Sequence, residues 1–524
     1  MVWWTTARAG IHRLRHLVVA RALPWTLLAA YLCAGNALPA AAFDFDDVVA
    51  TAKQQAREPY TDTRAQVPAW LLNITYDQWR DIRFRSDHAL WRDRHLPFEV
   101  QFFHPGLYYP RTIAVHEVTA EGVQPVISSS DEFDYGKNDF ASAIPPDLGY
   151  AGFRIHAPIK AAGYYDEVIV FLGASYFRAV GRDQGFGISA RGVAINTIAS
   201  SPEEFPDFKE YWLVTPAADA TQLTIYALLD GPSITGAYRF VVQPGEQTLV
   251  DVDARLFLRR PVEVLGIAPL TSMFFHGENS VHPFVDFRPE VHDSDGLLLH
   301  STSGEWLWRP LKNPHSTQVS ALQMQNPRGF GLLQRDRDFD HHQDLEAHTE
   351  LRPSVWVAPR GDWGKGHVDL VELPTNTDIN DNIVAYWVPT KLPKPGEAAA
   401  FAYTLYWYGD DPGRPPGGRV VATRRDWGTQ ENVYRFVIDF AGKTLESIPA
   451  DRPPRPTVTI ASGAAAGELI DQQIVKNPAT GGWRLSFQVR PKTTQALELR
   501  AFLSNESGAL TETWSYAALP WGAE

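Results

Sequence analysis

Two short stretches of this 524-residue sequence concentrate side chains that could carry acid–base chemistry. In the first, Thr375–Trp387 (TNTDINDNIVAYW), Asp378 and Asp381 lie among three asparagines and directly precede an apolar segment. In the second, Phe287–Leu297 (FRPEVHDSDGL), three acids surround one histidine. A tight turn needs only one or two such residues, so both stretches require a further explanation.

Two carboxyl groups held in different environments could cleave a glycosidic bond. One stays protonated and donates its proton to the leaving oxygen, while the other is ionised and activates water or attacks the sugar. Asp293 and Asp381 are candidates for such a pair, but they are far apart in the sequence, so only the fold could bring them together. From spacing alone, turns capped by their own Asp and Asn side chains remain the favoured interpretation.

Other motifs of catalysis or metal binding are absent or incomplete. The sequence contains no G-x-S-x-G motif of serine hydrolases. The run Asp336–His342 (DRDFDHH), followed by Asp344 and His348, is rich in potential ligands. It has a histidine where a calcium loop needs glycine, and no defined element carries its histidines at the spacing of a zinc site. We therefore predict a solvated polar loop there, with no metal and no cofactor.

The elements that would position these side chains are mostly strands. Short segments of alternating apolar and polar residues recur along the chain, for example at residues 98–102, 167–171, 223–228 and 238–242. Turns rich in glycine and proline separate them. Helices are predicted near the start, at Phe45–Arg57 and within Ala69–Ile82. The pattern predicts an all-β protein with a large N-terminal β-sandwich.

A domain boundary is expected near Pro389–Ala398 (PTKLPKPGEA), where prolines and a glycine would form a stiff connector. Beyond it strand-like segments resume, and their roughly 125 residues suit an immunoglobulin-like β-sandwich. We predict an N-terminal domain at residues 43–390, a linker at 391–398 and an immunoglobulin-like domain at 399–524.

The first 42 residues have the features of an export signal. Four arginines precede the apolar stretch Leu23–Cys33, and small residues follow at the A-x-A spacing before Phe43. We predict cleavage near Ala42. Because the only cysteine lies in this segment, the mature chain would contain none, which is typical of a bacterial periplasmic protein.

The composition argues against some partners and favours others. A net charge of -13 argues against nucleic acid or an anionic membrane surface. The 17 Trp, 19 Tyr and 27 Phe could stack on sugar rings, although the cores of a large β protein explain the same numbers. The candidates for sugar contacts are Trp356, Trp363, Tyr386 and Arg328; buried core or solvated positions are the alternatives.

Several segments together resemble the osmoregulated periplasmic glucan biosynthesis proteins of types D and G. They are Gly173–Arg178, Ser189–Gly192, Ala268–Phe274, Gly304–Leu311, Gly329–Arg335 and Val368–Trp387. The resemblance spans essentially the whole mature chain. It implies a large N-terminal β-sandwich similar to those of carbohydrate-active enzymes, a C-terminal immunoglobulin-like domain, and a periplasmic role in shaping β-1,2-linked glucans.

Members of this family have been grouped as glycoside hydrolases that act on β-1,2-glucan with inversion. By this resemblance, Asp381 would be the general acid and Asp293 would lie on the base side. Asp378 and Asn382 would bind sugar or relay protons. Some members transfer the chain instead and close it into a ring, an outcome that the same residues would support.

Two questions stay open at this point. Asp295, two residues after Asp293, favours type D, because type G members tend to carry an amide there, whereas the missing Arg-Arg pair of a twin-arginine signal argues against type D. The alternative to an enzyme is a non-catalytic glucan-binding factor that controls backbone length or branching with a membrane glucosyltransferase. The resemblance also allows a membrane glucan synthase and a second copy of the chain as partners.

Overall fold

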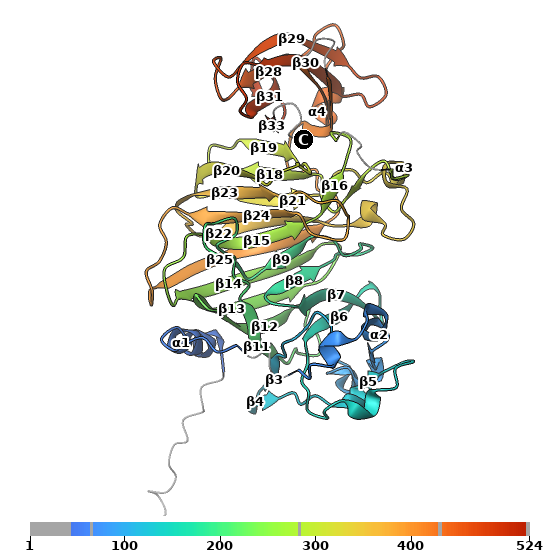
Figure 1. Ribbon diagram of the computed structural model, residues 1–524. Helices are drawn as coiled ribbons and strands as arrows, with labels where there is room; N and C mark the ends of the chain where they lie inside the picture. Colours follow the sequence, from blue (N-terminus) through green and yellow to red (C-terminus); the bar gives the residue numbers. More distant parts are fainter. Residues whose placement is uncertain (1–42, 63–66, 281–284, 428–431, 520–524) are drawn as a thin grey trace, which may run out of the picture. The chain divides into compact units, whose positions relative to one another are not determined.

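A computed structural model of the chain describes residues 43–62, 67–280, 285–427 and 432–519 (Figure 1). The predicted export signal at residues 1–42 lies outside these ranges, so its cleavage near Ala42 stays a prediction. Within the described ranges, no helix combines the length and the apolar character that a membrane crossing requires.

Strands dominate the fold, as predicted, and most of them belong to two large sheets. The first has ten strands. In spatial order they are β2 (Glu99–Phe103), β6 (Gly152–Ala161), β7 (Tyr164–Leu172), β8 (Tyr176–Ala179), β9 (Ser189–Arg191), β15 (Leu265–Ser272), β24 (Ile383–Pro389), β23 (Lys365–Glu372) and β20 (Gln318–Gln325), with β10 (Val193–Ile195) also paired to β15.

The second sheet has fifteen strands, eleven of which belong to the N-terminal sandwich. These eleven are β19 (Trp306–Pro310), β18 (Gly296–His300), β21 (Gly329–Leu333), β22 (Ser354–Arg360), β25 (Ala398–Tyr408), β14 (Thr248–Leu258), β13 (Ile234–Gln243), β12 (Leu223–Asp230), β11 (Asp207–Val214), β3 (Ala114–Thr119) and β4 (Gly122–Pro125). The remaining four are β28 (Arg455–Ile460), β31 (Leu497–Asn505), β33 (Thr513–Ala518) and β32 (Gly508–Ala509).

The two large sheets enclose the main hydrophobic core. Alternate residues of β14, such as Val250 and Val252, are fully buried, while their neighbours are partly exposed, so one face of the strand points inward. Aromatic rings meet across the sheets: the ring centroids of Phe171 in β7 and Phe240 in β13 lie 5.3 Å apart. This burial of large apolar side chains is the dominant stabilising contribution to the sandwich.

The C-terminal residues form the second predicted β-sandwich. The parallel pairing of β33 with β19 extends the fifteen-stranded sheet into this part of the chain. A four-stranded sheet packs against it and consists of β26 (Arg419–Trp427), β27 (Tyr434–Ala441), β30 (Trp483–Pro491) and β29 (Gly467–Lys476). Phe436 of β27 and Trp514 of β33 lie 5.5 Å apart in the core between the two sheets.

The predicted linker lies elsewhere in the architecture than we expected. β25, which begins at Ala398, pairs with β14 and β22 in the N-terminal sandwich, and its residues Tyr403, Leu405 and Trp407 are buried in the main core. Residues 391–398 therefore connect two strands of one sandwich, β24 in one sheet and β25 in the other. The prolines mark a loop between sheets and not a boundary between domains, and the chain leaves the sandwich only after Tyr408.

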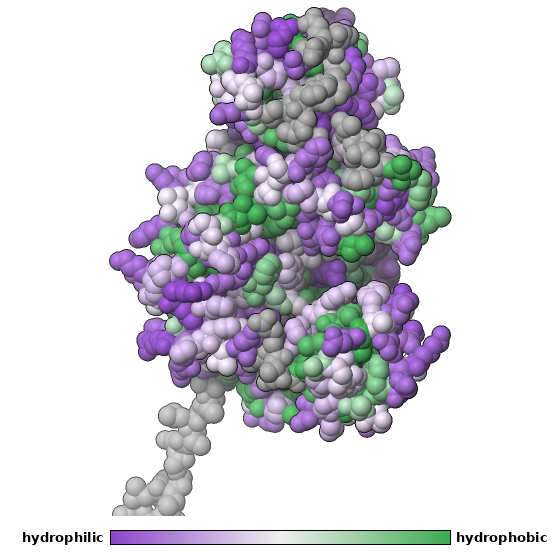
Figure 2. Space-filling view, viewed as in Figure 1, coloured by the Kyte–Doolittle hydropathy of each residue, from purple (hydrophilic) through white to green (hydrophobic). Residues whose placement is uncertain are grey.

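Short elements complete the fold: the pairs β1 (Arg83–Phe84) with β5 (Phe133–Asp134) and β16 (Phe274–His276) with β17 (Val291–His292), and the helices α1 (Phe45–Gln55), α2 (Tyr76–Arg80), α3 (Phe339–His342) and α4 (Lys443–Glu446). The helix predicted at the start is confirmed as α1. Asp44 caps it by accepting a hydrogen bond from Asp46 N at 2.8 Å. On the face shown in Figure 2, hydrophobic residues lie in small groups among hydrophilic ones.

Candidate active site

The loop that carries Asp381 joins β23 to β24 at the edge of a deeply buried strand. Ile383, Ala385 and Trp387 of β24 are fully buried, so the strand itself belongs to the core. An asparagine outside the loop fixes the loop's path: Asn313 Nδ2 donates to Thr375 O at 2.9 Å, and Thr375 N donates to Asn313 Oδ1 at 2.9 Å. The loop is thus held by side-chain amides and not by a strand ladder.

Asn382 holds the other end of this loop. Its Oδ1 accepts from Phe274 N at 2.8 Å, and its Nδ2 donates to Phe274 O and Leu373 O, both at 3.0 Å. These bonds satisfy both polar atoms of a buried side chain. In the structure Asn382 is therefore a clamp between β16 and the loop, and not the sugar ligand or proton relay that we expected.

A pocket of about 970 Å³ opens beside Asp381. Much of its wall is amide: Asn279, Asn313, Asn376, Asn380 and Asn382. Arg425 and Tyr516 of the C-terminal sandwich also line it, as do His276 and Lys312. Asn313 and Asn382 spend their amide groups on the protein itself, but Asn376 and Asn380 are exposed and can both donate and accept hydrogen bonds, so this wall suits a neutral ligand rich in hydroxyl groups.

Asp381 is solvent-accessible, yet protein atoms crowd around its carboxyl group. This desolvation raises the pKa of Asp381, and the positive charges of Arg178 and Arg352 oppose the shift without cancelling it. The carboxyl group therefore keeps a proton at higher pH than an ordinary aspartate while it remains open to a ligand. These are the two properties that a proton donor needs.

Asp293 lies in a different environment. It directly follows β17, its backbone N donates to Met273 O at 2.8 Å, and its side chain is buried. Its Oδ1 forms an ion pair with Nη1 of Arg352. Because the charge of Arg352 also acts on Asp381, the fold brings both predicted acids to the same arginine.

Asp378 belongs to a second arginine. Arg288 Nη1 contacts Asp378 Oδ2 at 2.9 Å and Asp344 Oδ2 at 3.0 Å, and its Nη2 contacts Asp286 Oδ2 at 2.7 Å. Three carboxylates thus share one guanidinium. This arrangement ties the loop of Asp381 to the segment that contains Asp344, and it gives Asp378 a role in positioning the loop.

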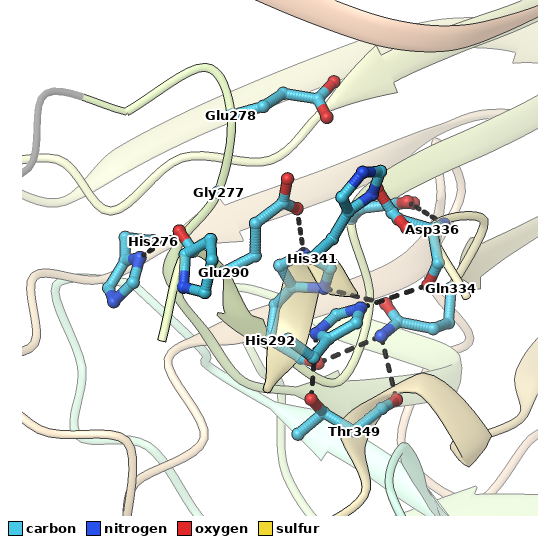
Figure 3. A network of polar contacts seen from close by, with 12 residues as sticks. His276, Gly277, Glu278, Glu290, His292, Gln334, Asp336, His341 and Thr349 are labelled. Atoms are coloured by element: carbon cyan, nitrogen blue, oxygen red, sulfur yellow. Dashed lines mark hydrogen bonds and ion pairs between the residues drawn. The ribbon is translucent and has the colours of Figure 1, made fainter. Parts of the chain in front are cut away.

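A buried polar network surrounds His292, the residue before Asp293 (Figure 3). His292 Nε2 contacts Glu290 Oε2 at 2.9 Å, and its Nδ1 contacts Gln334 Oε1 at 2.8 Å. Gln334 Nε2 donates to His292 O and Thr349 O, so the oxygen of this amide must face Nδ1 as an acceptor. Both ring nitrogens of His292 therefore donate hydrogen bonds, which requires the charged imidazolium.

The pKa values within the network follow from these contacts. Burial alone would lower the pKa of His292, but the Glu290 carboxylate outweighs it and raises this pKa to about 9. Burial, together with the nearby charge of His292, lowers the pKa of His342, whose Nδ1 meets Thr349 Oγ1 at 2.9 Å. Burial and then the charge of Glu290 raise the pKa of Glu278 to about 8.

The run at residues 336–348 is less solvated than predicted. His342 is fully buried, and α3 begins within the run with Asp338 as its cap. Among the described residues, one group of ligand types lies close enough to hold a metal ion, with ligand atoms of Glu290, Asp336 and His341 within 4.8 Å of one another. Glu290 already pairs with His292, and Asp336 pairs with His341 of the same group.

The aromatic and basic residues predicted to contact sugar are not among the residues that line the pocket. Trp356 packs in the C-terminal core, 5.6 Å from Trp306. Trp363 packs in the main core and donates from Nε1 to Ala402 O at 3.2 Å. Tyr386 is buried and its hydroxyl donates to Thr197 O at 3.3 Å. Arg328 directly precedes β21 and is exposed. The alternation of a strand does not reveal which of its faces is core.

Comparisons with known proteins identify the family of this chain. The family model described as "Periplasmic glucan biosynthesis protein, MdoG" matches residues 43–518. The chain belongs to this family. It is also 46% identical over 499 residues to "Glucans biosynthesis protein G" of Ralstonia nicotianae, covering 93% of this chain and 98% of that protein. The family description places its members in the periplasm and in glucan biosynthesis.

The crystal structure of Slr1438 from Synechocystis aligns with 64% of this chain and with 98% of the Slr1438 chain. At 11% identity and a TM-score of 0.14, this alignment does not support a shared fold.

Asp295, which led us to favour type D, is structural here: its Oδ2 accepts from the backbone N of Arg335 at 3.0 Å and of Asp336 at 2.9 Å. Type D therefore stays a prediction beside a relative that is named G.

Proposed function

We propose that this periplasmic glucan biosynthesis protein acts on the β-1,2-glucan backbone of osmoregulated periplasmic glucans by inverting cleavage or transglycosylation. The observation that supports this most is the contrast between the two acids. Asp381 is accessible at an amide-lined pocket with its pKa raised, while Asp293 is ion-paired, and Arg352 acts on both. Inverting glycosidases need this combination of one protonated and one ionised carboxyl group.

The reaction follows from these states. Asp381 gives its proton to the glycosidic oxygen as the bond to the anomeric carbon breaks. Asp293 accepts a proton from a water molecule, and the oxygen of this water bonds to the anomeric carbon from the opposite face. The anomeric configuration inverts, both carboxyl groups exchange protonation states, and solvent restores them.

Transfer uses the same residues. If a hydroxyl group of the glucan replaces the water, the new bond joins two sugars, and an inverted α-linkage can close a linear chain into a ring. The size of the pocket, about 970 Å³, leaves room for sugar units on one side of Asp381.

A binding factor without catalysis is the second candidate. The ion pair with Arg352 favours it, because a base that is already neutralised by an arginine accepts a proton less readily. In that case the amide-lined pocket would hold the glucan while a membrane glucosyltransferase extends or branches it. A second copy of the chain as a further partner, and removal of a signal peptide near Ala42, belong to the same proposal.

Incubation of the mature chain, residues 43–524, with linear β-1,2-glucan tests the proposal. Chain shortening or ring closure should occur with the wild-type protein and be lost in Asp381→Asn. Asp471→Asn, an exposed acid on β29, is the matched control and should keep full activity. Unchanged glucan at high protein concentration, together with measurable glucan binding, would contradict the enzyme and favour the binding factor. Anomer-resolved analysis of the products then separates hydrolysis from transfer.

A further inference from the structure

Arg352 is a charged group that none of the sequence motifs indicated. It lies between the 3-10 turn at Thr349–Leu351 and β22. Its side chain is 18% exposed, and its aliphatic part packs against Gly187, where an added Cβ would lie 3.0–3.2 Å from three of its carbons. The stem of this arginine is therefore confined on the side of Gly187.

The groups that act on this guanidinium come from three elements of the fold. Asp293, after β17, forms the direct ion pair. Asp381 and Asp378, from the loop before β24, act on it through their charges, and so does Arg178 of β8, with the opposite sign. Asp378 has its own partner in Arg288 at 2.9 Å, so the acids left for Arg352 to balance are Asp293 and Asp381.

The position of Arg352 near both acids matters because the two acids exchange protonation states during an inverting reaction. Before the reaction, Asp293 carries the negative charge and Asp381 is neutral. Afterwards Asp381 has lost its proton to the leaving oxygen, and Asp293 has gained one from water. One unit of negative charge has therefore moved from one carboxyl group to the other, and a cation that acts on both can stabilise the site before and after the transfer.

We propose that Arg352 is a positioning residue that orients the Asp293 carboxylate and balances, in turn, the negative charge on Asp293 and on Asp381. This role in catalysis rests on the proposed function. Arg352 itself exchanges no proton with the glucan. Its contribution should therefore appear in kcat and in the pH dependence more than in glucan affinity.

Arg178 provides a matched comparison. It is exposed, and its charge acts on Asp381 and on Arg352, while its guanidinium lies 5.5 Å from the ring of Phe186. The ion pair of Asp293 is with Arg352. Replacing Arg178 should therefore alter the titration of one acid, whereas replacing Arg352 should alter that of both.

The experiment compares Arg352→Met, Arg352→Lys and Arg178→Met with the wild-type chain. Loss of a positive charge raises the pKa of a nearby carboxyl group, so Arg352→Met should move both limbs of the kcat–pH profile to higher pH. It should lower kcat by about 100-fold, the size of effect expected when a reacting group loses its exact position, with KM changed little. Arg178→Met should move only the alkaline limb, and Arg352→Lys should restore much of the lost rate.

A second readout does not depend on turnover. Carbodiimide labels protonated carboxyl groups, so labelling against pH, followed by mass spectrometry that locates the label on single residues, gives one midpoint for Asp293 and one for Asp381. Both midpoints should rise in Arg352→Met, but only that of Asp381 in Arg178→Met. An unchanged Asp293 midpoint in Arg352→Met would overturn the inference. Inactivity of the wild-type protein would overturn the proposed function instead, while the labelling would still decide whether Arg352 couples the acids. If Arg352→Met does not fold, Arg352→Gln takes its place.

Discussion

The two acidic stretches look alike in sequence but form opposite environments in the structure. Around Asp381, the loop before β24 leaves a carboxyl group open to a large pocket, with arginines nearby. Around His292, the acids are closed in, and Glu290 is paired to a charged histidine. In the function we propose, Asp381 serves the reaction as an open acid, whereas Glu290 and His292 form a closed ion pair beside the proposed base, Asp293. The difference lies in access to solvent and in the nature of the cation.

The largest effect should come from removing the accessible acid. Asp381→Asn keeps the shape but cannot donate a carboxylic proton, so activity on β-1,2-glucan should fall by about 10³-fold. The melting temperature should stay close to that of the wild type, because the side chain is exposed. Reducing-end release and thermal melts measure the two quantities. A strong loss of stability would show that Asp381, like the buried network around His292, stabilises the fold, and would contradict its assignment as an open acid.

Breaking the buried pair should affect stability instead. His292→Leu leaves the buried Glu290 without its cation, and the free energy of unfolding should fall by about 3–5 kcal/mol. His341→Leu is the control: this histidine also pairs with an acid, Asp336, but its side chain is 49% exposed, so the loss should stay below about 1 kcal/mol. Urea unfolding followed by tryptophan fluorescence measures both. Equal losses would erase the contrast between buried and exposed pairs.

The buried pair also predicts how stability depends on pH. The pKa of His292 rises from 6.5 to about 9 on folding, so the folded state holds its proton more tightly than the unfolded state. The stabilisation is fully present below about pH 6.5 and is lost as the pH rises through about 9. Over this range the difference in unfolding free energy between wild type and His292→Leu should shrink by up to about 3 kcal/mol. A constant difference would contradict the charged histidine.

The smallest effect concerns Asn382, which connects the Asp381 loop to β16. Asn382→Ala removes three hydrogen bonds and leaves buried backbone groups at Phe274 and Leu373 without partners, so unfolding should become about 2 kcal/mol easier. Activity should fall with no change in the shape of its pH profile. Asn380→Ala, an exposed neighbour in the same loop, should leave stability unchanged. A shifted pH profile in Asn382→Ala would instead restore the proton relay that the sequence suggested.

Local patterns predicted much of the fold. The alternation of β30 and β31 in the sequence matches an alternation of buried and less buried residues, because one face of each strand meets a core. The assignment of β25 to the C-terminal domain was wrong, because prolines favour a loop but do not indicate which two strands the loop connects. Pairing between distant strands decides this, and it leaves no local mark in the sequence.

The site was only partly predictable, for a similar reason. Asp381 and Asp293 came from a resemblance, and the structure brings both within reach of one arginine. Arg352 lies in the segment Leu351-Arg352-Pro353, which carries no motif, so only the fold reveals its partner. Trp356 and Trp363 show the converse: a tryptophan's chemistry suits both a sugar platform and a core, and long-range packing chooses between them.

The parallel pairing of β33 with β19 has a consequence for any attempt to divide the protein. It makes the C-terminal sandwich a continuation of the central sheet, and Glu512 next to β33 holds Arg335 through two short contacts, the closer at 2.6 Å. Truncation after Tyr408 would leave one edge of β19 without its pairing partner and the buried guanidinium of Arg335 without its carboxylate. It would also remove Arg425 and Tyr516 from the pocket wall. The two sandwiches are therefore not independent modules. A C-terminal sandwich from another protein could replace this one only if the pairing of β33 with β19 and the contact between Glu512 and Arg335 were rebuilt.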